Sequence, residues 1–192
     1  MKYEDVQSPK QLMQYLDENF EYGVINKKGE KFNDSSDNAF QKACKEWKLK
    51  PVAEIIKSGV GHCYDQTEIE RDWFTSHGYM VKTFWVIACD KQNTSYGFSH
   101  AYIAYLENGK WYYFEHSSFP NKGIYEFDYI EELVNFQAQT QVKFAGSQHK
   151  PISGLYSVLT TEFDKPKDNI TMKEYMNFVS NAKIVLNKDF KN

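Results

Sequence analysis

The chain has 192 residues, a formal net charge of −3 at pH 7 and 17% aromatic residues. This length can enclose one sizeable core, and such aromatic content is typical of a packed globular protein. The small negative charge gives no reason to expect binding to nucleic acid or to an anionic membrane. No stretch approaches the roughly 20 apolar residues of a membrane span, and no apolar signal-peptide region opens the chain. With three widely spaced cysteines and no disulfide pattern, a reduced, cytoplasmic protein is expected.

Helical patterns dominate the N-terminal third. Ser8, Pro9 and Gln11 form a helix-start signal, and apolar residues then recur at helical spacing, so residues 9–20 are expected to form an amphipathic helix. The polar turn at 26–31 could join two short strands or be an exposed loop. A run of cap-type residues occupies 33–37. A helix is expected over 38–47, and a shorter helix is expected from Pro51 to Ile56.

Strand patterns dominate the middle of the chain, and helix returns at the end. The expected elements are a buried strand at 80–89, a polar loop at 90–97, a hairpin turning at 108–109, a short apolar run at 124–127, a helix capped by Asp128, a strand at 152–163 and a helix at 171–185. Thr171 and Glu174 have the spacing of a capping box. This order predicts the α+β class in a single domain of residues 1–192, with residues 121–192 as a C-terminal extension that completes the sheet and adds helices.

One cysteine lies where a glycine-rich loop gives way to a helical pattern. Gly59 and Gly61 precede Cys63, and the segment from Cys63 to Ser76 contains neither Gly nor Pro before Gly78 provides a stop. A thiol in the first turn of a helix feels the positive end of the helix dipole and unpaired N–H groups, both of which favour the thiolate. The same N–H groups can receive an oxyanion. Cys63 is therefore a candidate nucleophile.

Strand geometry predicts the partners of this cysteine. Asn-Gly at 108–109 between two aromatic-rich runs is typical of a two-residue type I′ hairpin turn. That turn places Tyr102 opposite Glu115, so His100 and Glu115 project from the same face, with backbones roughly 7–8 Å apart. The adjacent His116 points to the opposite face. Cysteine, histidine and carboxylate in this arrangement form a set of nucleophile, base and orienting group.

These segments resemble the bacterial transglutaminase-like superfamily. The matching residues are Gly61-His62-Cys63-Tyr64-Asp65, His100-Ala101-Tyr102, and Asn108-Gly109-Lys110-Trp111 with Glu115. The resemblance covers roughly residues 10–120 and implies a papain-like cysteine-enzyme fold, with helices packed on an antiparallel sheet, Cys63 as nucleophile and His100 as base. The family's usual Asp is here Glu115, and its usual Trp after the histidine is Tyr102. The glutamine that precedes a papain-type nucleophile is missing, and family analogy offers Tyr22 as the second oxyanion donor.

A thiol enzyme acting on peptide or side-chain amide bonds is the expected function. Cys63, His100 and Glu115 would form the catalytic triad, a thioester would be the intermediate, and hydrolysis of a protein or peptide substrate would follow without a cofactor. Acyl transfer to an amine, as in a transglutaminase, and a catalytically inactive binding module are the alternatives. The arylamine acetyltransferases use the same triad, but this chain lacks their Arg-Gly-Gly approach to the cysteine.

Several other residues have simpler interpretations. Cys44 and Cys89 lie inside apolar patterns and are expected to be small buried hydrophobic residues. Asp65 and Glu68 are expected to be first-turn carboxylates that suit the helix dipole and slightly oppose thiolate formation. Histidines and cysteines show no zinc-type spacing, so no metal site is expected. The sequence does not indicate an oligomeric state.

Overall fold

A six-stranded antiparallel sheet forms the centre of the molecule. The computed structural model describes residues 2–33, 38–118 and 121–191. In spatial order the strands are β10 (Lys183–Lys191), β9 (Leu155–Glu162), β5 (Met80–Asp90), β6 (Asn93–Glu107), β7 (Lys110–Glu115) and β8 (Gly123–Phe127). Because β9 pairs directly with β5, the C-terminal third of the chain shares this sheet with the middle third.

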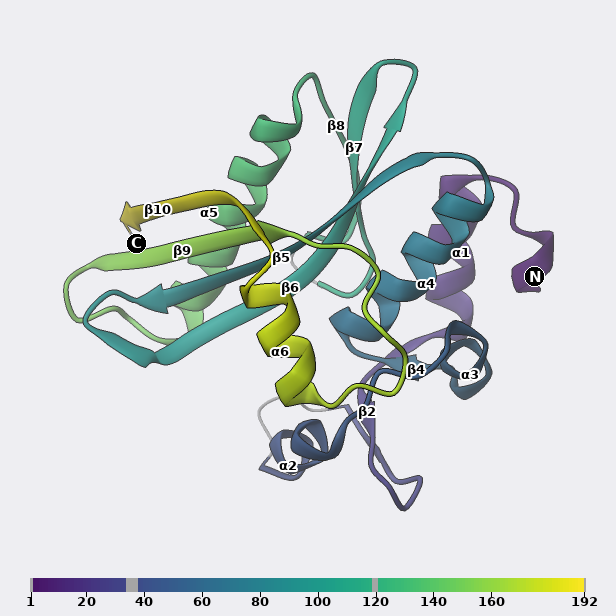
Figure 1. The fold of residues 1–192 in the computed structure, drawn as a ribbon, viewed down its shortest axis with the longest axis horizontal. Coiled ribbons are helices and arrows are strands. Elements are labelled where there is room, and N and C mark those ends of the chain that lie inside the picture. Colours follow the sequence, from purple (N-terminus) through teal and green to yellow (C-terminus); the bar gives the residue numbers. More distant parts are fainter. Residues whose placement is uncertain (1, 34–37, 119–120, 192) are drawn as a thin grey trace.

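Helices cover both faces of the sheet (Figure 1). They are α1 (Pro9–Asn19), α2 (Asn38–Glu46), α3 (Val52–Ser58), α4 (Cys63–Ser76), α5 (Ile130–Gln148) and α6 (Met172–Ser180), preceded by a 3-10 turn, η1 (Tyr3–Asp5). On β6, Ala101, Ile103 and Tyr105 join the core cluster that contains α4, because alternate side chains of a strand point to opposite faces. Tyr102 and Ala104 join the second cluster, which contains α5. The expected α+β class is confirmed.

Local signals identified several elements correctly. Ser8 caps α1 by accepting a hydrogen bond from the Gln11 N–H at 3.3 Å, and Thr171 and Glu174 form the capping box of α6. The polar turn at 26–31 joins two short paired strands, β2 (Val24–Ile25) and β3 (Lys31–Phe32).

The hairpin turn at 108–109 has the predicted geometry. Asn108 and Gly109 both have positive φ, of 50° and 78°, as a type I′ turn requires. Glu107 pairs with Lys110, and the register continues unchanged to Ile103 and Phe114. The predicted register is therefore confirmed over the length of the ladder.

Two expectations about strand pairing after residue 89 are wrong. The segment 90–97 is not a polar loop, because β6 begins at Asn93 and its pairing with β5 extends to Cys89 and Gly97. The last helix ends at Ser180, not at 185, and the residues that follow form β10 along β9. In both cases, pairing with a neighbouring strand outweighs the local pattern.

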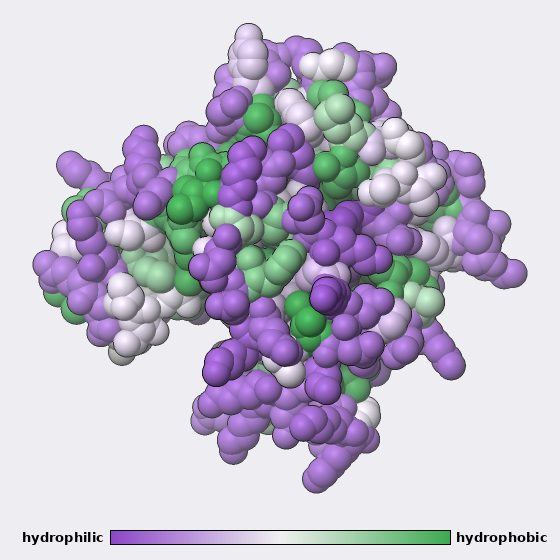
Figure 2. Space-filling view, in the orientation of Figure 1, coloured by the Kyte–Doolittle hydropathy of each residue, from purple (hydrophilic) through white to green (hydrophobic). Residues whose placement is uncertain are grey.

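The predicted cap of α5 is also wrong. Its N-cap residue is Tyr129, which makes no side-chain cap hydrogen bond, and the Asp128 carboxylate pairs with Lys110 on β7 instead. The cap-type run at 33–37 lies, apart from Asn33, outside the described residues. Among the described residues, no helix combines the length and the apolar character needed to cross a membrane. Hydrophilic residues predominate over the lower part of the face seen in Figure 2.

Candidate active site

The backbone before Cys63 is shaped to place this residue at the start of α4. Gly59 ends α3 with a φ of 62°, and β4 (Val60–Gly61) pairs in parallel with β1 (Glu21–Tyr22). A Cβ atom on Gly61 would lie 2.7 Å from the Cβ of Asp65, so no larger residue fits there without a shift. Cys63 is the first residue of α4 and is 7% exposed.

Cys63 lies beside a part of β6 that β7 does not cover. In the described residues, the pairing of β6 with β7 ends at Ile103 and Phe114, although β6 continues back to Asn93. The start of α4 fills this gap, and the Cys63 sulfur accepts a hydrogen bond from the backbone N–H of Ala101. The uneven lengths of the two strands therefore create the space that the thiol occupies.

The structure brings the three predicted site residues together. The His100 Nε2 atom lies 2.5 Å from Glu115 Oε2, and His100 also forms a side-chain hydrogen bond with Cys63. Since Nε2 faces the carboxylate, Nδ1 is the ring nitrogen left for the thiol. Glu115 and His100 share a face, as the hairpin register predicts.

Four groups hold the Glu115 carboxylate in place. One oxygen accepts from the Ser118 N–H at 2.7 Å and the Ser117 hydroxyl at 2.9 Å. The other accepts from the Tyr113 hydroxyl at 2.9 Å and faces His100. Glu115 is 2% exposed, so these contacts replace the water that a carboxylate would otherwise require. They fix the direction in which the carboxylate meets the imidazole.

The electrostatics of the site favour an ion pair between sulfur and imidazole. Burial opposes ionisation of the Cys63 thiol, but His100, the nearby His62 and the Ala101 N–H outweigh it, and the pKa of Cys63 is lowered. Burial also opposes the imidazolium, but Glu115 and Cys63 raise the pKa of His100 well above its usual value. The pKa of Glu115 is lowered despite burial, chiefly by His100. All three shifts act in the direction that favours a thiolate, an imidazolium and a carboxylate.

Glu70 is a second buried carboxyl near this set. It lies two turns after Cys63 on α4 and is 3% exposed. Burial and the neighbouring Glu115 raise the pKa of Glu70 well above its usual value. The pKa values of Glu70 and Glu115 are thus shifted in opposite directions, which favours a protonated Glu70 beside an ionised Glu115.

The two other cysteines provide an internal comparison. Cys44 and Cys89 are half-buried, and neither is in a disulfide. Burial raises the pKa of Cys44 to about 11 and raises the pKa of Cys89 as well. Among the three cysteines, only Cys63 has a lowered pKa.

His62 and Asp65 form a pair that the sequence analysis did not identify. The His62 Nδ1 atom lies 2.9 Å from Asp65 Oδ2, and the Trp47 indole N–H donates to the same carboxylate at 3.0 Å. Asp65 also raises the pKa of His62 against the effect of burial, and the charge of His62 favours the Cys63 thiolate. The expectation that Asp65 acts mainly against the thiolate therefore omitted the histidine whose protonated form Asp65 favours. A histidine at the N-cap with an acid three residues later was the available signal.

Glu68 also differs from its expected role. It is not a first-turn carboxylate but lies deeper in α4, is 2% exposed and contacts Arg71 at 2.6 Å. Burial raises the pKa of Glu68 to about 7, although Arg71 acts in the opposite direction. This pair belongs to the face of α4 that packs towards Phe163, over whose ring Arg71 lies at 5.1 Å.

Gln66 and His116 join the cysteine loop to the segment after β7. The Gln66 side chain donates to the Gly61 carbonyl at 2.8 Å, and its Oε1 atom lies 2.6 Å from His116 Nδ1. The His116 Nε2 atom lies 3.1 Å from Asp17, whose carboxylate also pairs with Lys122. His116 lies beyond the end of β7 and lines the same cleft as His100. The position of Gln66, three residues after Cys63 on the helix, was the only sequence signal for this network.

A cleft of about 440 Å³ opens onto Cys63 and His100. Its other lining residues are Asp17, Phe20, Tyr22, Ser99, His116, Ser117, Ser118, Lys122, Gln141 and Phe144. Burial of the hydroxyl, together with Cys63, raises the pKa of Tyr22, so this group remains a hydrogen-bond donor. Within the described part of the chain, no group of three His, Cys, Asp or Glu side chains is arranged to hold a metal ion.

No protein-family model matches this sequence, and a search of curated proteins finds no match.

Proposed function

We propose that the protein is a thiol hydrolase that cleaves amide bonds of peptides or proteins. The observation that carries this proposal is the buried, hydrogen-bonded set of Cys63, His100 and Glu115, which opens onto a cleft and has a lowered thiol pKa. A pKa shift produced by specific charged partners in a cleft is characteristic of a catalytic site. Cys44 and Cys89 lack these partners.

The reaction follows from the protonation states. The Cys63 thiolate attacks the amide carbonyl, and the C=O electron pair moves to oxygen. When the tetrahedral intermediate collapses, the C–N bond breaks and the His100 imidazolium gives its proton to the leaving amine. The neutral imidazole then takes a proton from water, which attacks the thioester and releases the carboxylic acid and the thiolate. Glu115 orients the ring throughout both steps.

Two donors are suited to the developing oxyanion. The backbone N–H of Cys63 lies in the first turn of α4, where N–H groups have no intrahelical partner. The Tyr22 hydroxyl comes from β1, which pairs with the cysteine loop at Gly61. Tyr22 therefore takes the place of the missing papain-type glutamine in this proposal.

The resemblance to the transglutaminase-like superfamily supports the same function. In that family a helix beginning at the cysteine packs on an antiparallel sheet that carries the histidine and the acid, and here α4 packs on β6. The proposal therefore includes a papain-like core, with the C-terminal β9, α6 and β10 added to one side of its sheet.

Iodoacetamide labelling from about pH 4 to pH 9, mapped by mass spectrometry, tests the proposal. Cys63 should react with an apparent pKa well below ~8.5, the usual value for a thiol, while Cys44 and Cys89 react only at alkaline pH. His100→Ala should reduce the Cys63 rate about 100-fold at about pH 6, because the thiolate loses its counter-ion. Equal reactivity of the three cysteines would contradict the proposal and favour an inactive binding module. An isopeptide cross-link as product would instead identify acyl transfer.

A further inference from the structure

The sheet has a free edge that leads directly to Cys63. In the described residues, β6 pairs with β5 along its length but with β7 only from Ile103 onwards. The preceding part of β6 therefore has one side without a strand partner. Ser95 and Gly97 are exposed, and Ser99 is half-buried where the edge enters the cleft.

The direction of the backbone groups on this edge follows from the hairpin. In a two-residue hairpin the residues flanking the turn form a hydrogen-bonded pair, so odd-numbered residues of β6 direct their N–H and C=O groups towards the β7 side. The Ala101 N–H, which bonds to the Cys63 sulfur, has this direction. Gly97 and Ser99 therefore present their backbone groups in the same row as the nucleophile.

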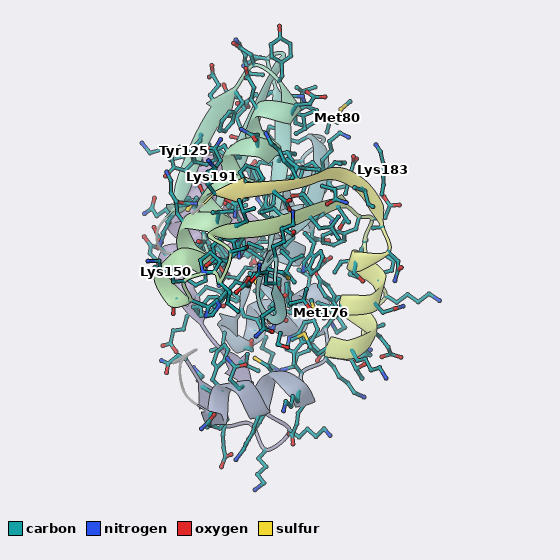
Figure 3. All side chains as sticks on the ribbon, turned by 90° about the vertical axis from the view of Figure 1, so that its left-hand side faces the viewer. Met80, Tyr125, Lys150, Met176, Lys183 and Lys191 are labelled. Atoms are coloured by element: carbon teal, nitrogen blue, oxygen red, sulfur yellow. The ribbon has the colours of Figure 1, made fainter. Side chains whose placement is uncertain are left out.

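The chemistry of this edge differs from that of the outer edge of the sheet. Strand edges in soluble proteins usually carry charged side chains, especially lysine, which prevent the addition of another strand. The outer strand β10 follows this rule with Lys183, Lys188 and Lys191, two of which are labelled at its ends in Figure 3. No charged residue occurs on β6 from Asn93 to Ser99. The edge beside the thiol is therefore open to strand addition.

One wall of the cleft comes from α5 and lies along the same edge. The Gln141 side chain donates to the Phe98 carbonyl at 2.9 Å, and the Phe144 ring meets the Phe98 ring edge-on at 5.9 Å. Gln141, Phe144 and Ser99 all line the cleft that contains Cys63. The α5 wall and the edge at Ser99 therefore border the same cleft.

We propose that Gly97 to Ser99 of β6 bind the substrate as an extended peptide that adds a strand to the sheet, with its carbonyl carbon beside the Cys63 sulfur. This inference rests on the proposed function and narrows it to main-chain amides in unfolded segments. Backbone hydrogen bonds would provide affinity largely independent of sequence. The side-chain amide of a folded protein cannot form this ladder.

Peptidyl acyloxymethyl ketones test the inference on the full-length protein. Their thioether forms when the Cys63 thiolate displaces the carboxylate, so the modification rate reports docking without a known substrate. The probes are an acetyl-tetra-alanyl compound and four derivatives, each N-methylated at a different amide. Because only alternate amides of a strand face its neighbour, N-methylation should slow modification about tenfold at alternate positions. At the positions between them, the rate should change less than twofold, which provides a matched control.

Two results would overturn the inference while leaving the proposed function intact. One is a rapid reaction of Cys63 with iodoacetamide but with none of the peptide probes. The other is a set of probe rates that does not alternate along the peptide. Failure of the proposed function has a different signature, because Cys63 would then react with iodoacetamide no faster than Cys44.

Discussion

Helix α4 carries two buried polar clusters on different faces, and they differ in how completely their atoms are paired. At the Cys63 end, the Glu115 carboxylate has four hydrogen-bond partners and His100 is held on both sides. On the other face, Glu68 and Arg71 contact each other, but Glu68 Oε1 and Arg71 Nη2 are buried without a hydrogen-bond partner among the described residues. Pairing of the Glu115 carboxylate on all sides fixes its geometry, although the nearby His62 ring forms no hydrogen bond among the described residues beyond its contact with Asp65. A partly paired ion pair costs stability. We infer that the first cluster serves chemistry and that the second affects only stability.

The largest expected effect comes from breaking the second cluster. Arg71→Met should lower the free energy of unfolding by about 3 kcal/mol, because Glu68 is left buried without a cation. The double variant Glu68→Met with Arg71→Met should recover most of this loss, since well-packed apolar residues commonly replace a buried ion pair at little cost. Urea unfolding monitored by tryptophan fluorescence measures the free energy of unfolding of both variants.

If the two clusters act independently, these variants should also leave the reactivity of the Cys63 thiol unchanged. The pH profile of Cys63 labelling in the double variant should match that of the unmodified protein. A shift of that profile would mean that the two faces of α4 are coupled, contrary to our inference.

A pH effect on stability should follow from Glu68. Burial raises its pKa from 4.5 to about 7, so the folded state retains a proton that the unfolded chain has released. The resulting destabilisation is absent below about pH 4.5, grows as the pH rises and is complete above about pH 7, where it amounts to about 3 kcal/mol. Unfolding of the unmodified protein should therefore become easier across this range. The double variant should lack this component of the pH dependence, and an unchanged slope would contradict the assignment.

A smaller effect, on the reactivity of the thiol, is expected from Glu115→Gln in the cluster around Cys63. The amide keeps the size of the side chain but removes the charge that stabilises the His100 imidazolium, so the pKa of His100 should fall and that of Cys63 should rise. Labelling of Cys63 at about pH 6 should slow about tenfold. Glu126→Gln, which changes an exposed carboxylate bonded to Tyr112 on the same hairpin, provides the control and should leave the rate unchanged.

The smallest effect on stability and on thiol reactivity is expected from a change of Lys122, which lines the cleft. Lys122 pairs with Asp17 in an exposed position, and such pairs contribute little to stability. Lys122→Ala should change the free energy of unfolding by less than about 0.5 kcal/mol and the Cys63 labelling rate less than about twofold. A larger change in rate would show that the network from Asp17 through His116 to Gln66 positions the cysteine loop.

Local sequence signals determined the parts of the site that depend on neighbours in the chain. The Asn-Gly turn at 108–109 fixes the register of its hairpin, because Asn and Gly both adopt the positive φ of a two-residue type I′ turn, whose twist matches that of the strands. The register then puts His100 and Glu115 on one face without knowledge of the rest of the fold. The helix start at Cys63 is similarly local, since it depends on the glycines before it and the uninterrupted helical pattern after it.

Contacts between distant segments were decided only by the tertiary structure. The segment after Ser180 becomes β10 because β9 offers it a partner, and the polar residues after Asp90 extend β6 because β5 lies beside them. Glu68 carries no local sign that it is buried. A charged or polar residue has the same sequence context in water and in a core, and only packing decides which environment it meets.

The sequence by itself therefore determined which residues can form the site and which of them share a strand face. The meeting of Cys63 with His100 required the whole sheet. It depends on β7 ending at Glu115, on β6 continuing beyond it, and on α4 packing so that its first turn fills the gap. Strand lengths and helix packing reflect the burial of apolar surface across the molecule, which no short stretch of sequence contains.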